Sequence, residues 1–252
     1  TLAAENDLNN SQASIEIIKN NGNFISKKIN KEKYASEMKV KADAQFTLGI
    51  IYFEGKDVEK DTNKGIKYLN QAANNNHIKA LYNLGILYYE GIYVPKDIHK
   101  AINLLLLAAN QNMTDSETTL GFIYYQGVEV HQDIQKAIYF LNRAAIKNDY
   151  QAMFYLADIY LSKKCSCQDF NKAFYFLSKS VEQNYAPAQY LIGLLYFAGH
   201  VVNKDIDKAI YYFKLAAKQN DSRAQDILGD IYSIGIYVCN DVNQAMKYYT
   251  LA

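Results

Sequence analysis

The chain has no tryptophan, only two prolines and only three cysteines among its 252 residues. Three cysteines are too few, and odd in number, so a disulfide framework is excluded as the main source of stability. Scarce proline leaves helices uninterrupted, because proline is the residue that breaks them most strongly. No apolar run approaches the roughly 20 residues that a membrane-spanning helix needs. The sequence therefore predicts a helical protein without a membrane span.

An excess of either charge is missing as well. The chain has 27 basic and 26 acidic side chains, which gives a formal net charge of +1. Net charge thus provides no reason to expect nucleic acid or an anionic membrane as a partner. Half of the residues are hydrophobic and 21% are charged, which is the composition of a folded protein rather than a disordered one.

What the sequence does contain is one pattern that returns every 36 residues. Between Ala80 and Asn112, an Ala-x-x-x-Leu-Gly-x-x-Tyr run is followed by glycine, valine, aspartate, a Lys-Ala pair, an alanine pair and asparagine. The Leu-Gly-x-x-Tyr part starts at Leu48, Leu84, Leu120, Ile192 and Leu228, and the fourth copy reads Leu156, Ala157, Tyr160. A fixed period of this length predicts a stacked solenoid. The alanine in the fourth copy indicates a position that needs a small residue because a helix presses against it.

Each unit is predicted to form two helices. In the first helix, alanine, leucine and tyrosine at i, i+4 and i+8 share one buried stripe, and a glycine ends the helix in the left-handed conformation. We expect a valine to cover the core and an aspartate to cap the second helix. These residues are Gly55, Gly91, Gly127, Gly199 and Gly235; Val58, Val94, Val130, Val202 and Val238; and Asp61, Asp97, Asp133, Asp169, Asp205 and Asp241.

The second helix is expected to place a large apolar residue against a small pair, and asparagine in the left-handed conformation is expected to end it. The large residues are Tyr68, Leu104, Phe140, Phe176, Tyr212 and Tyr248, and the asparagines are Asn76, Asn112, Asn148, Asn184 and Asn220. The small pairs are Ala72-Ala73, Ala108-Ala109, Ala144-Ala145 and Ala216-Ala217, with Ser180-Val181 as the exception. We take Tyr52, Tyr88, Tyr124, Tyr160, Tyr196 and Tyr232 as the core tyrosines of the six units.

The pattern divides the chain into a cap and six units. Residues 1–42, with a basic amphipathic helix over residues 25–41, are predicted to form an N-terminal cap or a degenerate repeat. The six units span residues 43–78, 79–114, 115–150, 151–186, 187–222 and 223–252, the last of them truncated. We expect more repeats, a cap or further domains after Ala252 in the parent protein.

The fourth unit is irregular in its loop, where Ser162–Cys167 lacks both the glycine and the valine. This loop is our first candidate for a bend or a special contact. We interpret Cys165, Cys167 and Cys239 as small loop residues, with a strained redox pair or a thiol metal site as alternatives. His131 lies one repeat before Cys167, so stacking would bring a histidine and a cysteine together as zinc ligands. The favoured expectation is no metal and no cofactor.

The chain resembles the Sel-one-like repeat family, whose members are relatives of the tetratricopeptide repeat. The resemblance lies in the spacing Ala-x-x-x-Leu-Gly-x-x-Tyr-x-x-Gly-x-x-Val-x-x-Asp-x-x-Lys-Ala. Five of the six units match it at nearly every position. The resemblance implies an all-α fold, a right-handed α-solenoid or superhelix whose first helices line the concave face. Family members act as adaptors and scaffolds, many of them secreted or envelope proteins of bacteria that meet eukaryotic hosts. A cysteine-rich branch linked to penicillin binding pairs cysteines within each repeat, which this chain does not do.

By analogy with tetratricopeptide geometry, a second set of aromatic residues faces the concave groove. The predicted partner-binding residues are Phe46, Phe53, Tyr82, Tyr89, Phe122, Tyr125, Phe154, Tyr190 and Phe197. The groove becomes acidic at its C-terminal end, where Asp226 and Asp230 follow the same stripe. The alternative is that these rings only pack between successive first helices. Tyrosine and phenylalanine provide the rigid contact area that binding surfaces favour.

The sequence therefore favours a non-catalytic scaffold that binds a peptide or a partner protein in an aromatic groove. No phosphate loop, nucleophile elbow, His-Glu-x-x-His or Cys-x-x-Cys motif is present. Abundant Asn, Lys, Ile and Tyr fit an AT-rich genome and a host-associated bacterium, which favours a secreted, effector or periplasmic protein. We expect no nucleic-acid partner and no membrane insertion. The alternatives are a docking arm of a larger enzyme or membrane-associated complex, and a weak β-lactam-binding relative of the cysteine-rich branch.

Overall fold

The computed structural model describes residues 33, 36–55, 57–162, 167–199, 203–235 and 241–252. The expectations for most of the N-terminal cap, for Cys165 and Cys239, and for Val202 and Val238 lie outside the described residues. The chain divides into two compact units, Thr1–Asp97 and Ile98–Ala252. Each unit is described by itself.

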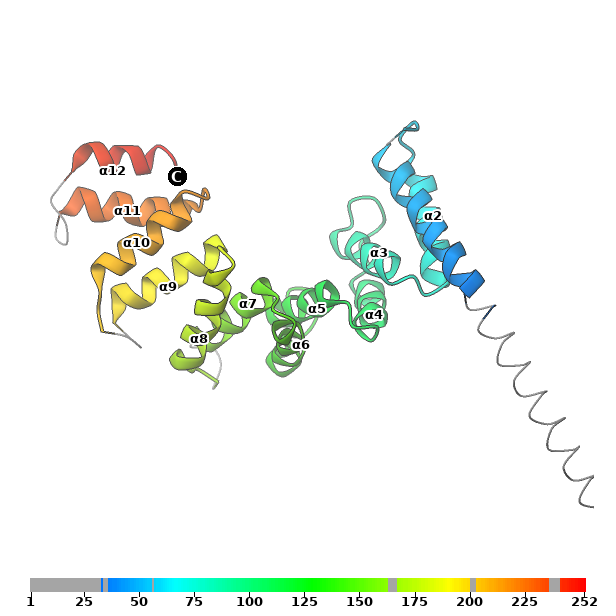
Figure 1. Cartoon of the computed structure of the whole chain (residues 1–252), viewed down its shortest axis with the longest axis horizontal. Helices are drawn as coiled ribbons and strands as arrows, with labels where there is room; N and C mark the ends of the chain where they lie inside the picture. The colour runs from blue at the N-terminus through cyan, green and yellow to red at the C-terminus, as the bar shows by residue number, and fades with distance from the viewer. Residues whose placement is uncertain (1–32, 34–35, 56, 163–166, 200–202, 236–240) are drawn as a thin grey trace, which may run out of the picture. The chain divides into compact units, whose positions relative to one another are not determined.

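Helices joined by short loops make up the described residues, and no strand occurs among them (Figure 1). A helix over residues 36–54 comes first, and the helices that follow are α2 (Thr62–Asn74), α3 (Ile78–Glu90), α4 (Ile98–Ala109), α5 (Thr114–Gln126), α6 (Ile134–Ile146), α7 (Tyr150–Leu161), α8 (Phe170–Glu182), α9 (Ala186–Ala198), α10 (Ile206–Ala217), α11 (Ser222–Ile234) and α12 (Val242–Tyr249).

The first unit contains the helix over residues 36–54, α2 and α3. The first of these helices continues without a break across residue 42, where the predicted cap ends. Its Gly49 lies so close to α2 that a Cβ atom there would be 2.9 Å from Cγ of the buried Leu69. His77 caps α3, because its Nδ1 accepts a hydrogen bond of 3.1 Å from the backbone N–H of Ala80. The sequence analysis missed this histidine cap.

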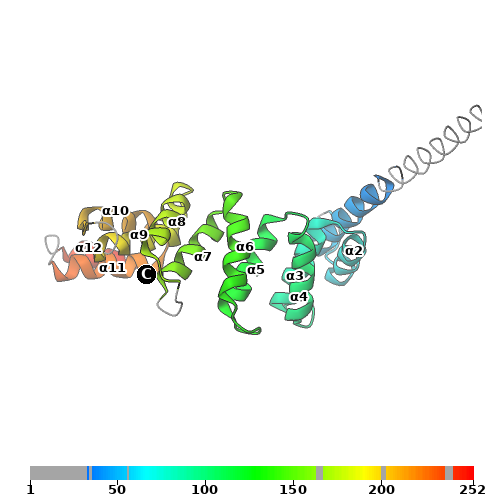
Figure 2. The same cartoon turned by 90° about the horizontal axis from the view of Figure 1, so that it is seen from below.

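The second unit stacks α4 to α12 in sequence order. The helices pack within repeats (α5 on α6, α7 on α8, α9 on α10, α11 on α12) and between repeats (α4 on α5, α6 on α7, α8 on α9, α10 on α11). Figures 1 and 2 show the same order of neighbours from two directions. Stacking of nearest neighbours is the packing that a repeat array requires, because each repeat completes its core with the next one.

The predicted helix ends are confirmed in the described residues. Gly55, Gly91, Gly127, Gly199 and Gly235 have φ between 62° and 77°, and Asn76, Asn112, Asn148, Asn184 and Asn220 have φ between 58° and 64°. The carboxylates of Asp61, Asp133, Asp169, Asp205 and Asp241 accept hydrogen bonds of 2.9–3.0 Å from the backbone N–H three residues later. These contacts satisfy backbone groups that a helix leaves without a partner at its ends.

The core differs from the prediction by one residue in each helix. The predicted core tyrosines are half-buried, and in five of the six repeats the residue before the tyrosine is buried instead: Leu87, Ile123, Ile159, Leu195 and Ile231. In the first repeat Ile51 is half-buried, and Leu48, which was predicted for the buried stripe, is 38% exposed. In the second helices, Phe140 is buried but Tyr68, Phe176, Tyr212 and Tyr248 are half-buried. The fully buried positions there are Leu69, Leu105, Leu141, Leu177 and Phe213. These side chains take the core position because the small residues of the first helices make room for them.

The displaced aromatic residues stack on one another at the edge of the core. The pairs are Tyr52–Tyr68, Tyr124–Phe140, Tyr160–Phe176, Tyr196–Tyr212 and Tyr232–Tyr248, with centroids 5.7–6.1 Å apart and planes within 10°. The ammonium of Lys64, Lys136, Lys172 or Lys208 lies 4.1–5.3 Å from the tyrosine ring in four of these pairs. Each stack therefore joins the two helices of one repeat outside the core.

The predicted need for a small residue after the leucine of the Leu-Gly-x-x-Tyr pattern is confirmed. A Cβ atom on Gly121 would be 2.5 Å from Cγ of Leu141, and one on Gly193 would be 2.6 Å from the ring of Phe213. The valine prediction holds only in part, because Val94 and Val130 are half-buried but Val58 is 38% exposed.

Candidate functional site

All nine predicted groove residues are half-buried, so each keeps part of its ring open to solvent. In the first unit, the ring of Phe46 stacks on His77 with centroids 4.4 Å apart, and Phe53 meets Tyr93 edge-on at 4.9 Å. The ammonium of Lys96 lies 5.7 Å from the centre of the Tyr89 ring. These rings combine packing with exposure, which is the state in which an aromatic side chain can still contact a partner.

In the second unit the structure joins two of the predicted residues into one aromatic cluster. Tyr155 lies between them, with its centroid 5.1 Å from that of Phe122 and 5.4 Å from that of Phe154. Phe154 also meets Tyr185 edge-on at 5.4 Å, and Tyr185 lies 4.9 Å from Tyr150. These five residues, which we name the ring cluster, come from α5, α7 and the residue before α9.

The environment of the ring cluster affects the ionisation of one member. Burial raises the pKa of the Tyr185 hydroxyl to about 12, and the neighbouring hydroxyls of Tyr155 and Tyr150 act in the same direction. In the next repeat, the guanidinium of Arg223 lies 4.6 Å from the centre of the Tyr190 ring, and its Nη2 donates a hydrogen bond of 2.6 Å to Asp221 Oδ2. The sequence analysis missed Tyr150, Tyr155 and Tyr185 because it sought one stripe on each helix.

Tyr125, one of the nine predicted groove residues, meets Asp158 of the next repeat in a small polar pocket between α5 and α7. The Tyr125 hydroxyl donates a hydrogen bond of 2.8 Å to Asp158 Oδ2. The pocket has a volume of about 220 Å³, and Gln126, Gln132 and Ser162 are among its lining residues. Burial raises the pKa of the Tyr125 hydroxyl most strongly, and the hydrogen bond to Asp158 raises it further. The tyrosine therefore remains a neutral donor that holds the carboxylate in place.

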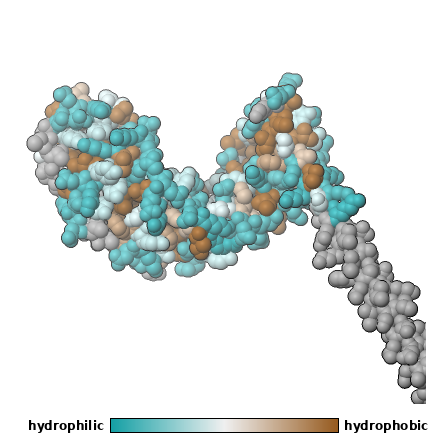
Figure 3. Space-filling model, viewed as in Figure 1, coloured by the Kyte–Doolittle hydropathy of each residue, from teal (hydrophilic) through white to brown (hydrophobic). Residues whose placement is uncertain are grey.

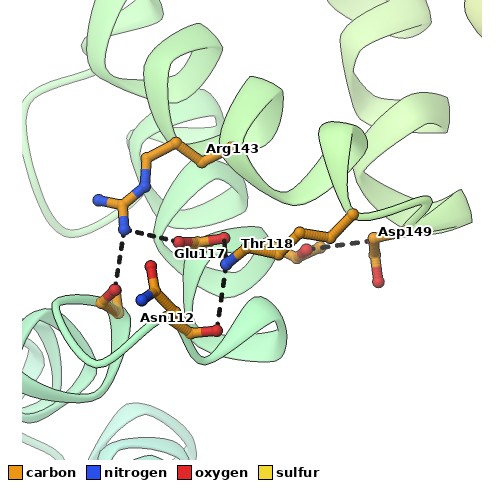
Figure 4. Close-up of polar contacts among 7 residues, drawn as sticks. Asn112, Glu117, Thr118, Arg143 and Asp149 are labelled. Atoms are coloured by element: carbon orange, nitrogen blue, oxygen red, sulfur yellow. Dashed lines mark hydrogen bonds and ion pairs between the residues drawn. The ribbon is translucent and has the colours of Figure 1, made fainter.

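Away from the groove, α5 contains a buried carboxylate with two cationic partners (Figure 4). Glu117 is 0% exposed, and its oxygens lie 2.8 Å from Arg143 Nη2 and 2.8 Å from Lys147 Nζ. The Arg143 contact is an ion pair whose direction falls outside hydrogen-bond geometry, whereas Lys147 donates a hydrogen bond to Oε2. Both cations also donate to carbonyl oxygens of the preceding repeat, at Ala109 and Asn112. This cluster therefore joins two successive repeats.

The second helices expose a set of tyrosines that the sequence analysis also missed. Tyr139, Tyr175 and Tyr211 lie on α6, α8 and α10, one repeat apart, and are 57%, 58% and 57% exposed. We name this set the tyrosine ladder. Figure 3 shows that hydrophobic and hydrophilic residues alternate over the surface of the second unit seen in that view. The sequence signal was an aromatic residue immediately before Phe140, Phe176 and Tyr212 at the same 36-residue spacing.

Cys167 is disulfide-bonded, which agrees with the alternative of a redox pair and contradicts the favoured interpretation as a small loop residue with a free thiol. It is therefore neither a free loop thiol nor a metal ligand. His131 places its Nδ1 2.7 Å from the carbonyl oxygen of Gln132. Within the described ranges, no three His, Cys, Asp or Glu side chains are grouped as metal ligands.

No helix in the same ranges is long and apolar enough to cross a membrane.

The repeat pattern matches a known family along nearly all of the described chain. The family model for the Sel1 repeat matches residues 42–77, 78–113, 115–149, 151–185, 186–221 and 222–252. The chain belongs to the Sel1 repeat family. Sel1 repeat proteins typically mediate protein–protein interaction and are generally non-catalytic. The match confirms the predicted family and the helical solenoid fold.

Solved structures of Sel1 repeat proteins are similar to this chain. A Sel1 repeat protein from Oxalobacter formigenes has 31% identity and a TM-score of 0.76 over 83% of this chain and 86% of that one. The protective antigen c5321 of uropathogenic Escherichia coli, which has an SLR fold, has 26% identity and a TM-score of 0.76 over 86% of this chain. The match covers 48% of the c5321 chain, so this chain spans about half of that antigen.

A more distant likeness concerns the fold alone. The immunity protein Pa5087 of Pseudomonas aeruginosa shares 23% identity over 83% of this chain and 80% of that one, with a TM-score of 0.53. Among curated proteins, none matches this chain in sequence.

Proposed function

We propose that this Sel1 repeat chain is a non-catalytic scaffold that binds a protein partner along the face formed by its first helices. The ring cluster is the observation that carries the proposal. Five aromatic rings from α5, α7 and the start of α9 touch in series. Four of them are half-buried, and Tyr150 is exposed. Aromatic side chains held rigidly by their neighbours and still open to solvent are typical anchors of protein interfaces.

The same face supports a partner in extended or helical form. Within each compact unit the predicted groove residues recur with the repeat, so they offer contacts at regular intervals to an extended peptide or to one stripe of a helix. Asp226 and Asp230 are exposed at the C-terminal end of this stripe. A partner that follows the groove is therefore expected to carry apolar anchors and to become basic towards this end.

We further propose a bacterial, host-facing setting, with secretion or a periplasmic location. The similarity to a protective antigen of uropathogenic Escherichia coli supports this setting. The abundance of Asn, Lys, Ile and Tyr agrees with it.

The test compares two surfaces of one folded protein. A tagged chain is used to capture partners from host-cell and bacterial lysates, beside a Y89A/Y125A variant of the groove face and a Y139S/Y175S/Y211S variant of the tyrosine ladder. We expect the groove variant to lose at least about tenfold in partner binding, while the ladder variant retains it. Thermal unfolding must stay cooperative in both variants. Retained binding by a folded groove variant contradicts the proposal, and loss only in the ladder variant moves the binding surface to the second helices.

A further inference from the structure

The pocket between α5 and α7 is too small for a cofactor but large enough for one side chain. Its volume of about 220 Å³ lies below the roughly 300–1,000 Å³ of pockets that hold drug-sized ligands. Both helices belong to the second unit, and the pocket lies where groove residues of two successive repeats meet. A ligand of this size on a protein-binding face corresponds to a single side chain of the partner.

The lining of the pocket is rich in hydrogen-bond acceptors and contains one negative charge. Among the described residues that line the pocket, Asp158 is the only charged one, and none of them is basic. Its Oδ2 accepts from Tyr125, but a carboxylate has about four acceptor sites, so most of them remain for a ligand. Gln132 uses its amide N–H₂ group to donate a hydrogen bond of 2.7 Å to the Tyr125 carbonyl, which leaves its amide oxygen as an acceptor.

The other repeats do not reproduce this chemistry. The pairs at the corresponding positions are Phe53 and Ile86, Tyr89 and Phe122, Leu161 and Leu194, and Phe197 and Asp230. None of these pairs combines a hydroxyl with a carboxylate. The Tyr125–Asp158 pair is therefore a departure from the repeat at one place, and such a departure is not needed for stacking.

We infer that this pocket binds the guanidinium group of an arginine side chain of the partner. The inference rests on the proposed function, because it names the partner's chemistry at one point of the same face. A guanidinium has five N–H donors in a planar fork and no acceptor, which matches a carboxylate surrounded by amide and hydroxyl oxygens. Tyr125 is a positioning residue here, since its hydroxyl fixes the orientation of the carboxylate that pairs with the guanidinium.

The experiment needs no identified partner. The purified chain is titrated with N-acetyl-arginine amide and followed by amide NMR, with N-acetyl-citrulline amide as an uncharged ligand of nearly the same shape. We expect arginine-specific shifts at the C-terminal end of α5, near Gln132 and along α7. Asp158→Asn keeps an acceptor for the Tyr125 hydroxyl and removes the charge, so arginine binding should weaken at least about tenfold. Tyr125→Phe keeps the charge but frees the carboxylate, and should weaken binding less.

Glu182→Gln is the control, because Glu182 is an exposed carboxylate of the same unit that pairs with Lys179 on α8 at 2.9 Å and lies outside both the pocket and the groove. It should leave arginine binding unchanged. Equal binding of citrulline, or unchanged arginine binding by D158N, overturns the inference. Partner capture by D158N is measured as well, and full capture overturns the arginine assignment. The scaffold proposal itself fails only if the folded Y89A/Y125A variant keeps its partner, so the two failures are distinguishable.

Discussion

Glu117 shows how a single residue can depart from the repeat without disturbing the fold. The equivalent positions in the other repeats are Gln45, which is half-buried, and Leu81, Met153, Gln189 and Gln225, which are buried. A buried carboxylate is costly unless it is paired, and here two cations of α6 and the following turn compensate it. The sequence already contained this signal as a charge at a core position, followed one helix later by Arg143 and Lys147.

The charge of Glu117, rather than its shape, should determine its contribution to stability. Glu117→Gln keeps the volume and leaves Arg143 and Lys147 without their anion, so we expect the free energy of unfolding to fall by about 1–3 kcal/mol. Urea unfolding measures the change. Glu182→Gln is the control, since Glu182 pairs with Lys179 on the surface and should change the free energy by less than about 0.5 kcal/mol. Equal effects of the two exchanges would contradict the buried pairing.

The raised pKa of Tyr185 predicts a loss of stability in alkali. The folded protein holds the hydroxyl proton up to about pH 12, whereas the unfolded chain releases it near the ordinary value of 10.0. The folded state then binds more protons than the unfolded state, so the free energy of unfolding falls as pH rises above the lower value. In Tyr185→Phe this fall should be smaller. Unfolding in urea across the alkaline range tests it, with Tyr211→Phe as the control for loss of an exposed hydroxyl.

At the scale of the helix, the sequence predicted where the helices end better than which face of each helix is buried. Glycine, asparagine and aspartate specify local backbone conformations and capping bonds, so the ends of helices such as α6 and α10 follow from a few neighbouring residues. The buried face depends on where the partner helix lies, which is not a local property. Tyr124 and Ile123 are adjacent on α5, and only the packing of α6 decides which of them is buried.

The candidate site shows the same division. Phe122, Tyr125 and Phe154 lie at half-buried positions of the first helices, which helix periodicity predicts, and their role in partner binding stays a prediction. The ring cluster and the polar pocket each join residues from successive repeats, and their contacts depend on the rotation between neighbouring helices. A single 36-residue pattern does not contain that rotation, so Tyr155, Tyr185 and the Tyr125–Asp158 bond were not predictable.

Helix packing also predicts a size limit at Gly121. Its missing Cβ atom leaves room for Leu141, and a methyl group there would be 2.5 Å from Cγ of that side chain. Gly121→Ala should therefore lower the free energy of unfolding by about 1–3 kcal/mol, although alanine is the better helix former. Leu141→Ala in the same chain should remove the clash. The double variant should therefore lose less free energy of unfolding than the losses of the two single variants added together. Thermal unfolding of the four proteins gives the coupling.

At the scale of the whole array, hydrogen bonds between repeats recur at one position. Lys147 Nζ and Gln183 Nε2 donate to the carbonyl oxygens of Asn112 and Asn148, at 3.1 and 2.8 Å. Gln219 occupies the next equivalent position and lies 3.3 Å from Asn184 Oδ1. Each bond joins only neighbouring repeats, so stability in the second unit should be a sum of local terms.

Because the stabilising contacts are local, the effect of a substitution on amide hydrogen exchange should decrease with distance from it. In Glu117→Gln, amide hydrogen exchange should accelerate in α5 and α6, and less in α4 and α7 beside them. Exchange in α11 and α12 should stay as in the unaltered protein, because no described contact of Glu117 reaches those helices. Uniform acceleration along the second unit would show instead that it unfolds as one cooperative block.

The spacing of these bonds also affects how such a gene can change. The donors and acceptors at Lys147, Gln183 and Gln219 are each 35 residues apart along the chain. Duplication or loss of a whole 36-residue segment would recreate every one of these partnerships with the adjoining copy, whereas an insertion of two or three codons within a helix would misalign them. Length in this lineage is therefore expected to vary in complete modules, while loops such as the one before α6 accept smaller changes.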